Sequence, residues 1–423
     1  MKGQRASVAA ACLGWFFSAV DTVLLILFQK EVADGLGVDV QAIRITIGVG
    51  LMGSAVGGIV FAQLGDRIGR VRTLAWSVVL YSVATAGMAA APNVAALMAF
   101  RFLAGIGTGG EWSVGMALIA EVWPRASRGT VGGIVAGMFN LGTFLAIALF
   151  QSGIGWRVSF AVMFVPALGV VWLRRRVPES PVWTALHEAR TAGGIGDAEA
   201  AASIRRSPVL ALFRGSLAGV VVKTTAIFAV MNFAFFSFST IFINYLQEDV
   251  ARGGLGLDAR AQAPYQIVLN FGGMLGLMAA GALSDRLGRR LAYTIFCLVG
   301  VGGYGLLFNL ARAQREAGAG LILTFAVICM SYGIGSVMGS MASELFPTHL
   351  RSTGPGVCQN LGKGIGGLLG PLLAGAWVVQ FGYAPVLAMP GICLAVLAVL
   401  IWTLPDVTGR ELRPIERESS LSG

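Results

Sequence analysis

Long runs of apolar residues, separated by short polar segments, make up most of the chain. About twelve runs reach the roughly 20 apolar residues that a helix needs to cross a bilayer; the first begins at Ala6 and the last ends near Leu404. The runs lack the strict alternation of apolar and polar positions that is typical of membrane-barrel strands. The pattern therefore predicts an all-α polytopic membrane protein with twelve transmembrane helices.

Two short motifs each occur twice, in the same order and at nearly the same separation. "LGDRIGR" at 64–70 returns as "LSDRLGR" at 283–289, and "EVWPRASR" at 121–128 returns as "ELFPTHLR" at 344–351. Such repetition indicates a duplicated unit of six spans. We expect a first six-helix bundle over residues 1–173, a charged cytoplasmic linker over 174–208, a second bundle over 209–405, and a cytoplasmic tail over 406–423.

The composition agrees with a membrane protein and limits its partners. Hydrophobic residues make up 56% of the chain and charged residues 12%, whereas a soluble domain carries about 25% charged residues. The net charge of +10 comes mostly from Lys and Arg in the termini, the linker and the motif loops. Because cytoplasmic loops are enriched in these residues, both termini are predicted to be cytoplasmic, in the inner (cell) membrane, and no nucleic-acid partner is needed to explain the charge.

Five ionisable residues fall inside predicted spans, where each costs about 2.5 to 3.5 kcal/mol on insertion scales. They are Asp21 in span one, Arg101 and Glu111 in span four, Lys223 in span seven and Lys363 in span eleven. Such residues normally face protein or water and are candidates for function. The five cysteines lie in apolar runs without metal-ligand spacing, so neither a metal nor a cofactor is predicted.

The repeated D-R-x-G-R and E-x-x-P-x-x-x-R motifs, together with "RFLAGIGTGGEW" at 101–112, resemble the major facilitator superfamily. More narrowly, "GIGTGGEW" and "EVWPRASRG" resemble its metabolite:proton symporters, in the sialate/lactate branch. The resemblance implies two six-helix pseudo-repeats that alternate access to a central site, in a protein that functions as a monomer in membrane lipid. It also implies that spans three, six, nine and twelve lie outermost, and the interiors of these four contain no Asp, Glu, Lys or Arg. The chain departs from the relatives at Ser18, where they often carry an acid, and at Lys363, where many carry arginine.

Three residues are candidates for proton coupling: Glu111, Asp21 and Arg101. Burial disfavours the charged form of a carboxyl group, which suits a residue that must bind and release a proton. Glu111 is the first choice and Asp21 the second, with a purely structural ion pair as the alternative. By resemblance Arg101 takes part in conformational or proton coupling; alternatively it holds backbone carbonyls of neighbouring helices.

Lys363 is too deep in its span for easy snorkelling, so it needs an anion, which is either a substrate carboxylate or a protein acid such as Asp21 or Glu111. Lys223 is closer to the end of its span, where snorkelling suffices. Other residues that could orient a small ligand are uncharged, with packing as the alternative role. They are Asn360, Gln359, Asn232, Phe235, Phe236, Asn270, Gln266, Tyr332 and Asn140.

The repeated motifs supply a set of gating residues. By resemblance, their contacts stabilise the outward-facing state and break when the inner side opens; alternatively the arginines only fix topology. The set consists of Gly65, Asp66, Arg67, Gly69, Arg70, Glu121 and Arg128 in the first half and Asp285, Arg286, Gly288, Arg289, Glu344 and Arg351 in the second.

Together these features predict a secondary active transporter that imports a small organic anion, such as a monocarboxylate, sialate or aromatic acid, with a proton. A sugar or polyol carrier, an exporter of the same superfamily, and a non-transporting membrane receptor are the alternatives. An enzyme is not expected, because no H-E-x-x-H motif occurs and the buried acids have no nearby histidine in the sequence.

Overall fold

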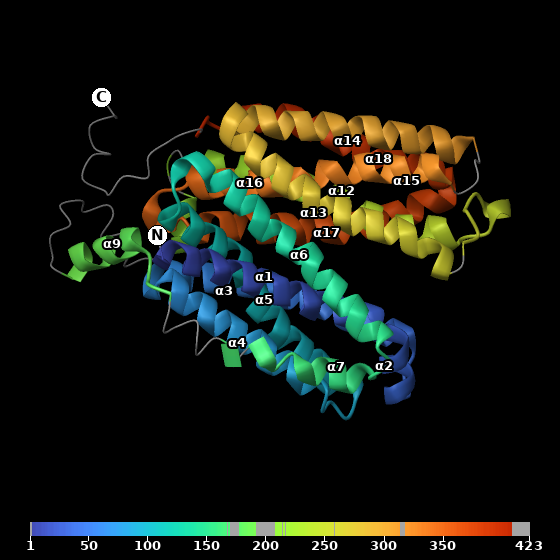
Figure 1. The fold of residues 1–423 in the computed structure, drawn as a ribbon, viewed down its shortest axis with the longest axis horizontal. Coiled ribbons are helices and arrows are strands. Elements are labelled where there is room, and N and C mark those ends of the chain that lie inside the picture. Colours follow the sequence, from blue (N-terminus) through green and yellow to red (C-terminus); the bar gives the residue numbers. More distant parts are fainter. Residues whose placement is uncertain are drawn as a thin grey trace.

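The computed structural model describes residues 2–166, 168–169, 177–191, 208–213, 215, 217–257, 259–313 and 318–407. The first half contains helices that run back and forth along one axis (Figure 1). They are α1 (Lys2–Leu27), α2 (Gln29–Leu36), α3 (Val40–Ile68), α4 (Arg70–Met88), α5 (Val94–Val122), α6 (Arg128–Gln151) and α7 (Trp156–Val162). Two shorter helices follow, α9 (Pro181–Thr191) and α11 (Pro208–Leu212).

The second half repeats this plan. Its helices are α12 (Leu217–Gln247), α13 (Ala259–Leu287), α14 (Arg289–Arg312), α15 (Ala319–Met330), α16 (Ile334–Leu345), α17 (Thr353–Phe381) and α18 (Tyr383–Leu400). Short 3₁₀ turns occur at Arg125–Ser127, Val250–Arg252, Ser331–Gly333, Thr348–Leu350 and Ile401–Thr403. The turn at Ser331–Gly333 joins α15 to α16 within one span.

Ten of the described helical segments are long and apolar enough to cross a membrane. Helix α5 lies outside this set but has 29 residues, and it carries both Arg101 and Glu111. Helix α7 begins the predicted sixth span, of which residues 167 and 170–173 lie outside the described residues. The predicted all-α, twelve-helix architecture is confirmed. The predicted linker and tail lie mostly outside the described residues, so their boundaries stay predictions.

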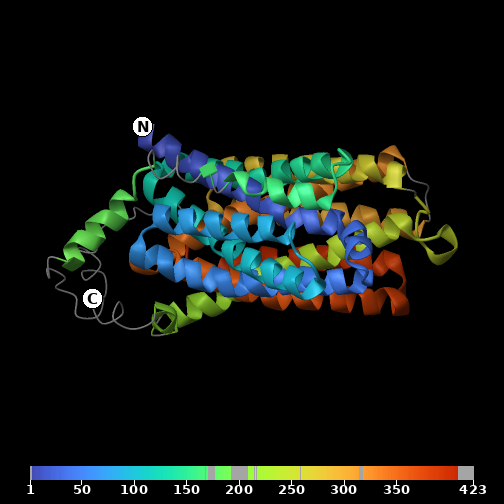
Figure 2. The same cartoon turned by 90° about the horizontal axis from the view of Figure 1, so that it is seen from below.

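Each half has its own apolar core. In the first, Phe28, between α1 and α2, packs edge-on against Phe160 of α7, with ring centroids 6.3 Å apart. In the second, Phe242 of α12 packs against Phe325 of α15 at 4.7 Å. Figure 2 shows the N-terminus of the chain and α9 (Pro181–Thr191) at the same end of the helices. The two halves converge at this end and diverge toward the other (Figure 1).

The two halves are joined where they converge by aspartates that cap helices of the opposite half. Asp66, near the end of α3, accepts hydrogen bonds from the backbone N–H groups of Ser352 (3.3 Å) and Thr353 (2.8 Å) and from the Thr353 hydroxyl (2.7 Å). These donors belong to the first turn of α17. A carboxylate there satisfies unpaired N–H groups and interacts favourably with the helix dipole.

The second half repeats the arrangement with Asp285 at the end of α13. Its carboxylate accepts hydrogen bonds from Gly129 N–H (2.7 Å), Thr130 N–H (2.7 Å) and the Thr130 hydroxyl (2.8 Å), at the start of α6. Gly69 and Gly288 precede α4 and α14 with φ of 109° and 87°, a region that L side chains rarely adopt. The repeated glycines therefore allow the tight turn that follows each aspartate.

Buried ion pairs surround both caps. In the first set, Arg70 contacts Asp66 at 3.0 Å and Glu121 at 2.9 Å, and Glu121 reaches Arg351 of the other half at 3.3 Å. The second set has the same order: Arg289 contacts Asp285 (2.9 Å) and Glu344 (3.0 Å), and Glu344 reaches Arg128 (3.3 Å). We call this end of the molecule, defined by these eight residues, the ion-pair end. Each acidic residue of the motifs thus bonds across the boundary between the halves.

The remaining motif residues have other positions. Arg67 and Arg286 are exposed at the ion-pair end. Gly65 lies against the Ser352 side chain, where an added Cβ would be 3.2 Å from the hydroxyl oxygen. Away from the ion-pair end, α3 packs against α17 and α6 against α13, with small residues at the contact: an added Cβ on Gly133 would lie 2.5 Å from the Leu277 carbonyl oxygen.

If the aspartate caps hold the halves together, Asp66→Ala should open the ion-pair end. Loss of one cap costs about 1 to 2 kcal/mol, enough to change the populations of two conformations several-fold. Spin labels at the exposed positions of Arg67 and Arg286, in a background without the native cysteines, report the separation of the halves by pulsed electron resonance. We expect a longer-distance population in Asp66→Ala.

Glu248→Ala serves as the control, because its exposed ion pair with Arg252 (3.5 Å) lies at the opposite end of α12. It should leave the distance distribution unchanged. A folded Asp66→Ala protein with the wild-type distribution would show that this cap does not hold the halves together.

Candidate functional site

A buried ion pair connects the first and fourth spans. Arg101 of α5 contacts Asp21 of α1, with Nη1 and Oδ2 3.1 Å apart, and Nη1 also donates to the Asp21 carbonyl oxygen at 3.2 Å. The hydroxyl of Thr85, on α4, donates to the other carboxylate oxygen of Asp21. Both charged side chains are almost fully buried. Of the alternatives open from the sequence, the structure pairs Asp21 with Arg101.

Lys363 lies beside this pair but at the boundary between the halves. Its Nζ is 3.4 Å from Oγ of Ser54 on α3, and the side chain is half-buried. Arg101 borders α3 one turn away: a Cβ added to Gly50 would lie 2.6 Å from Arg101 Nε. No carboxylate of the described residues lies within ion-pair distance of Lys363. With all three side chains ionised, the group formed by Asp21, Arg101 and Lys363 carries one excess positive charge.

Aromatic side chains from both halves lie around the middle of the molecule. Trp112 of α5 meets Phe228 of α12 edge-on, with ring centroids 5.8 Å apart. Phe235 contacts Tyr332 at 5.4 Å and Phe236 at 5.3 Å. Such rings provide large apolar and π surfaces, which suit packing and ligand binding alike.

The candidate amide residues are engaged mainly with their own helices. The side-chain amides of Asn232, Asn270 and Asn360 donate to backbone carbonyls one turn earlier, at 2.7, 3.0 and 2.8 Å. Gln266 and Gln359 are half-buried. Asn140 and Tyr332 both border Gly273: a Cβ added there would lie 3.7 Å from the Asn140 amide oxygen and 3.3 Å from the Tyr332 ring. The structure thus brings Asn140 and Tyr332 together across the boundary between the halves.

Glu111 lies inside the first half rather than beside Lys363. Its carboxylate is buried against α1, where a Cβ added to Gly14 would be 2.3 Å from Oε1, and Ser18 is near enough to interact with it. Neither carboxylate oxygen has a hydrogen-bond partner of good geometry among the described residues. Unlike Asp21, Glu111 forms no ion pair with any residue that the structure describes.

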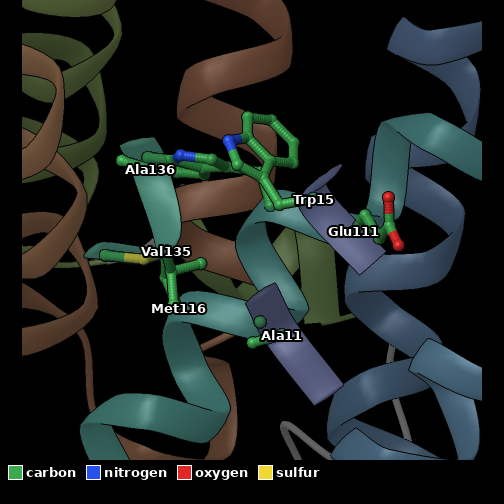
Figure 3. A pocket seen from close by; sticks show the side chains of 8 residues that line it. Ala11, Trp15, Glu111, Met116, Val135 and Ala136 are labelled. Atoms are coloured by element: carbon green, nitrogen blue, oxygen red, sulfur yellow. The ribbon is translucent and has the colours of Figure 1, made fainter. Parts of the chain in front are cut away.

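A small pocket borders Glu111, with space for about one water molecule. Its lining residues come from α1, α5 and α6: Ala11, Trp15, Glu111, Trp112, Gly115, Met116, Val135 and Ala136. Figure 3 shows the Glu111 carboxylate at one side of the pocket, turned away from Val135 and Ala136. The acid therefore faces the interior of the first half, toward α1 and α4.

Three side chains at these sites were not singled out from the sequence: Ser54, Thr85 and Trp112. Thr85 is the clearest case. Span three was expected to lie outermost, whereas more than half of the residues of α4, including Thr85, are buried. Lys223 agrees with the snorkelling interpretation, since its exposed Nζ donates to the Thr403 carbonyl oxygen at 3.2 Å.

Comparisons with known proteins agree with this architecture. The sequence profile of the Major Facilitator Superfamily matches residues 10–360. A putative metabolite transport protein of Haemophilus influenzae is 31% identical, over 86% of each chain, and the sialic acid transporter NanX of Escherichia coli is 25% identical, over 94% of this chain and 93% of the relative.

The fold is also similar to that of the proton:xylose symporter XylE, solved with 6-bromo-6-deoxy-D-glucose. The TM-score is 0.79 at 20% identity, over 97% of this chain and 98% of that chain. At this identity the likeness shows the fold alone. The profile match and the 31% identical relative show more, because they cover most of the chain. The chain therefore belongs to the Major Facilitator Superfamily, and it is a multi-pass membrane transporter rather than an enzyme.

Proposed function

We propose that this transporter imports a small organic acid together with a proton, by alternating access around the boundary between its two halves. The observation that supports the proposal best is the excess positive charge of the group formed by Asp21, Arg101 and Lys363. An unpaired cation away from water is costly, and a carboxylate entering this site loses hydration that a cation must replace. A substrate carboxylate bound at Lys363 would satisfy both needs.

The relatives agree with an acidic substrate. Sialic acid, which NanX carries, contains a carboxylate. XylE carries a neutral sugar with a proton, so a sugar or polyol carrier is the second candidate. The cation at position 363 favours the acid, because a neutral sugar leaves the Lys363 charge uncompensated.

Glu111 is our candidate for the coupling proton. Arg101 already neutralises Asp21, whereas among the described residues no cation is paired with Glu111, so a bound proton is what neutralises that carboxyl group. A proton on Asp21, the second candidate, would release Arg101 and strengthen the attraction for an anion. Either acid can therefore link proton binding to the conformational change.

We also propose that the ion-pair end faces the cytoplasm, since the basic residues of the motif loops lie there. The described conformation then corresponds to an outward-facing or occluded state, with the two aspartate caps in place. Opening to the inside would break hydrogen bonds at both caps. Release of the substrate and the proton would then favour re-formation of these hydrogen bonds.

The proposed function predicts uptake of an acid by purified protein in liposomes. Under an imposed pH gradient, acidic outside, at least one labelled acid from a panel of lactate, pyruvate, sialate and aromatic acids should accumulate, and xylose and glucose should not. Accumulation of a sugar instead would support the second candidate. Failure of every compound to respond to the pH gradient would contradict proton-coupled import.

Lys363→Ala should weaken binding of the transported acid. Truncating one partner of a buried charge pair costs about 2 kcal/mol or more, which is roughly a 30-fold increase in Kd. Lys363→Arg should retain much of the affinity, because it keeps the charge while changing the geometry of the hydrogen bonds. Calorimetric titration of purified, monodisperse variants measures both. Wild-type affinity in well-folded Lys363→Ala would show that this cation does not bind the substrate.

Glu111→Gln should abolish uphill, pH-driven accumulation while substrate counterflow continues, because a neutral amide imitates the protonated acid. Both activities are measured in the same liposomes, with Glu248→Gln, at a half-buried position far from the buried acids, as the control. Full pH-driven accumulation in Glu111→Gln would move the coupling proton to Asp21, for which Asp21→Asn is the corresponding test.

A further inference from the structure

Hydroxyl groups form a buried line along one face of α4. Thr73, Ser77, Tyr81 and Thr85 follow Arg70 at intervals of three or four residues, the spacing of one helical face. All four are at most 1% exposed. This face packs on α5, since a Cβ added to Gly107 would lie 2.7 Å from the Tyr81 Cβ. A polar line therefore crosses a region that would ordinarily be apolar.

The line connects the buried acids with the ion-pair end. At one end, the Thr85 hydroxyl donates to Asp21, and Tyr81 lies near enough to Glu111 and Asp21 to feel both charges. At the other end, Arg70 contacts Asp66 and Glu121. The titratable groups facing Glu111 are Asp21 from α1 and Tyr81 from α4.

The hydroxyls of Thr73 and Ser77 make no hydrogen bond of good geometry to the backbone carbonyls of their own helix. In other spans, Thr46, Thr143 and Thr324 donate to the backbone carbonyl four residues earlier, at 2.8 to 3.1 Å. By contrast, Thr73 Oγ1, Ser77 Oγ and Tyr81 Oη lack a hydrogen-bond partner of good geometry among the described residues. Buried polar atoms are rarely left unpaired in proteins. Thr73 and Ser77 therefore point to hydrogen bonding with something other than the described protein atoms, whereas Tyr81 also lies near enough to Ser82 to interact with it.

The spacing fits bridging water. The backbone positions of successive members are about 6 Å apart along the helix axis, so short side chains such as Thr73 and Ser77 need a bridging molecule, such as water, to be linked by hydrogen bonds. A hydroxyl accepts one hydrogen bond and donates another, so a chain of hydroxyls and waters can pass a proton without leaving a charge behind.

The second half provides an internal comparison. At the offset of the repeated motif, the places of Thr73, Ser77 and Tyr81 are taken by Ala292, Phe296 and Gly300 of α14. The place of Glu111 is taken by Ile334. Arg289 and Glu344, the equivalents of Arg70 and Glu121, are retained. The fold and the ion-pair end therefore form without the hydroxyl line, which occurs in the half that contains the buried acids.

We propose that Tyr81, Ser77 and Thr73, with bridging water, form a proton path inside the first half, separate from the route of the substrate. The inference rests on the proposed proton-coupled function. The Glu111 carboxyl gives up its proton to the hydroxyl–water chain, each member passes one proton on, and Glu121, whose Oε2 lacks a hydrogen-bond partner of good geometry among the described residues, receives it. Because the Glu121 side chain is buried and paired with Arg70 and Arg351 here, it releases the proton to water only when the two halves separate at the ion-pair end. The O–H bond broken at Glu111 is matched by the one formed at Glu121, and the chain itself is unchanged.

The test compares two buried phenols. Tyr81→Phe removes a link of the proposed path, whereas Tyr293→Phe removes an equally buried phenol on α14 that also lacks a hydrogen-bond partner of good geometry among the described residues. Thr73→Val and Ser77→Ala remove the next two hydroxyls without leaving an unpaired group. The probe is whichever acid of the panel of lactate, pyruvate, sialate and aromatic acids the wild type accumulates most strongly.

Two rates are measured in the same liposomes: pH-driven uptake with dye-detected proton entry, and counterflow at equal pH. We expect pH-driven uptake and proton entry to fall by about 10-fold or more in Tyr81→Phe and in the Thr73→Val, Ser77→Ala double variant, while the counterflow rate is maintained. Tyr293→Phe should match the wild type in both rates.

The outcomes separate the path from the function on which it rests. Wild-type proton entry in folded Tyr81→Phe and double variants overturns the path and leaves proton-coupled import intact. An equal loss of counterflow and pH-driven uptake indicates a packing role and also overturns the path. A wild type that accumulates no acid under a pH gradient overturns the proposed function, and the path with it.

Discussion

The cost of holding charge away from water governs this structure. Within the described residues, the buried arginines at the ion-pair end all contact acids, as Arg101 contacts Asp21, and the two buried aspartates of the motifs also cap helices. Two side chains depart from this rule: Lys363 has no acid within ion-pair distance and Glu111 no paired base among those residues. In the proposed function a mobile species of opposite sign compensates each departure, an anion at Lys363 and a proton at Glu111.

The same constraint connects the central site with the ion-pair end. The acids Glu121 and Glu344 each contact one arginine of their own half and one of the other half, so each loses one of its two ion pairs when the halves separate. Separating the two halves at this end exposes the charged side chains to water, and this hydration lowers the free-energy cost of breaking the ion pairs. The conformational change can therefore be nearly balanced in free energy, as a carrier requires, and a bound anion or proton of modest affinity can decide its direction.

Much of the architecture followed from the sequence, because its signals are repeated or strong. Apolar runs predicted the helices, and two repeated motifs predicted the halves. The contacts of Lys363 did not follow, since a sequence does not fix how each helix is rotated against its neighbours. Both Asp21 and Glu111 were open partners for this lysine, yet Arg101 takes the first and α1 covers the second. Thr73, Ser77 and Tyr81 were missed because uncharged hydroxyl residues are common in membrane helices, and only their orientation in the structure distinguishes them.

We propose that the carrier recognises the negative charge of its substrate. This is tested by comparing the Kd of each transported acid with the Kd of its primary amide, both measured on the wild-type protein. The two ligands share size and shape but differ in charge, so calorimetric Kd values isolate the contribution of the cationic site. We expect the acid to bind more tightly by about 2 kcal/mol or more, roughly 30-fold in Kd. Equal affinity for the acid and the amide would contradict it.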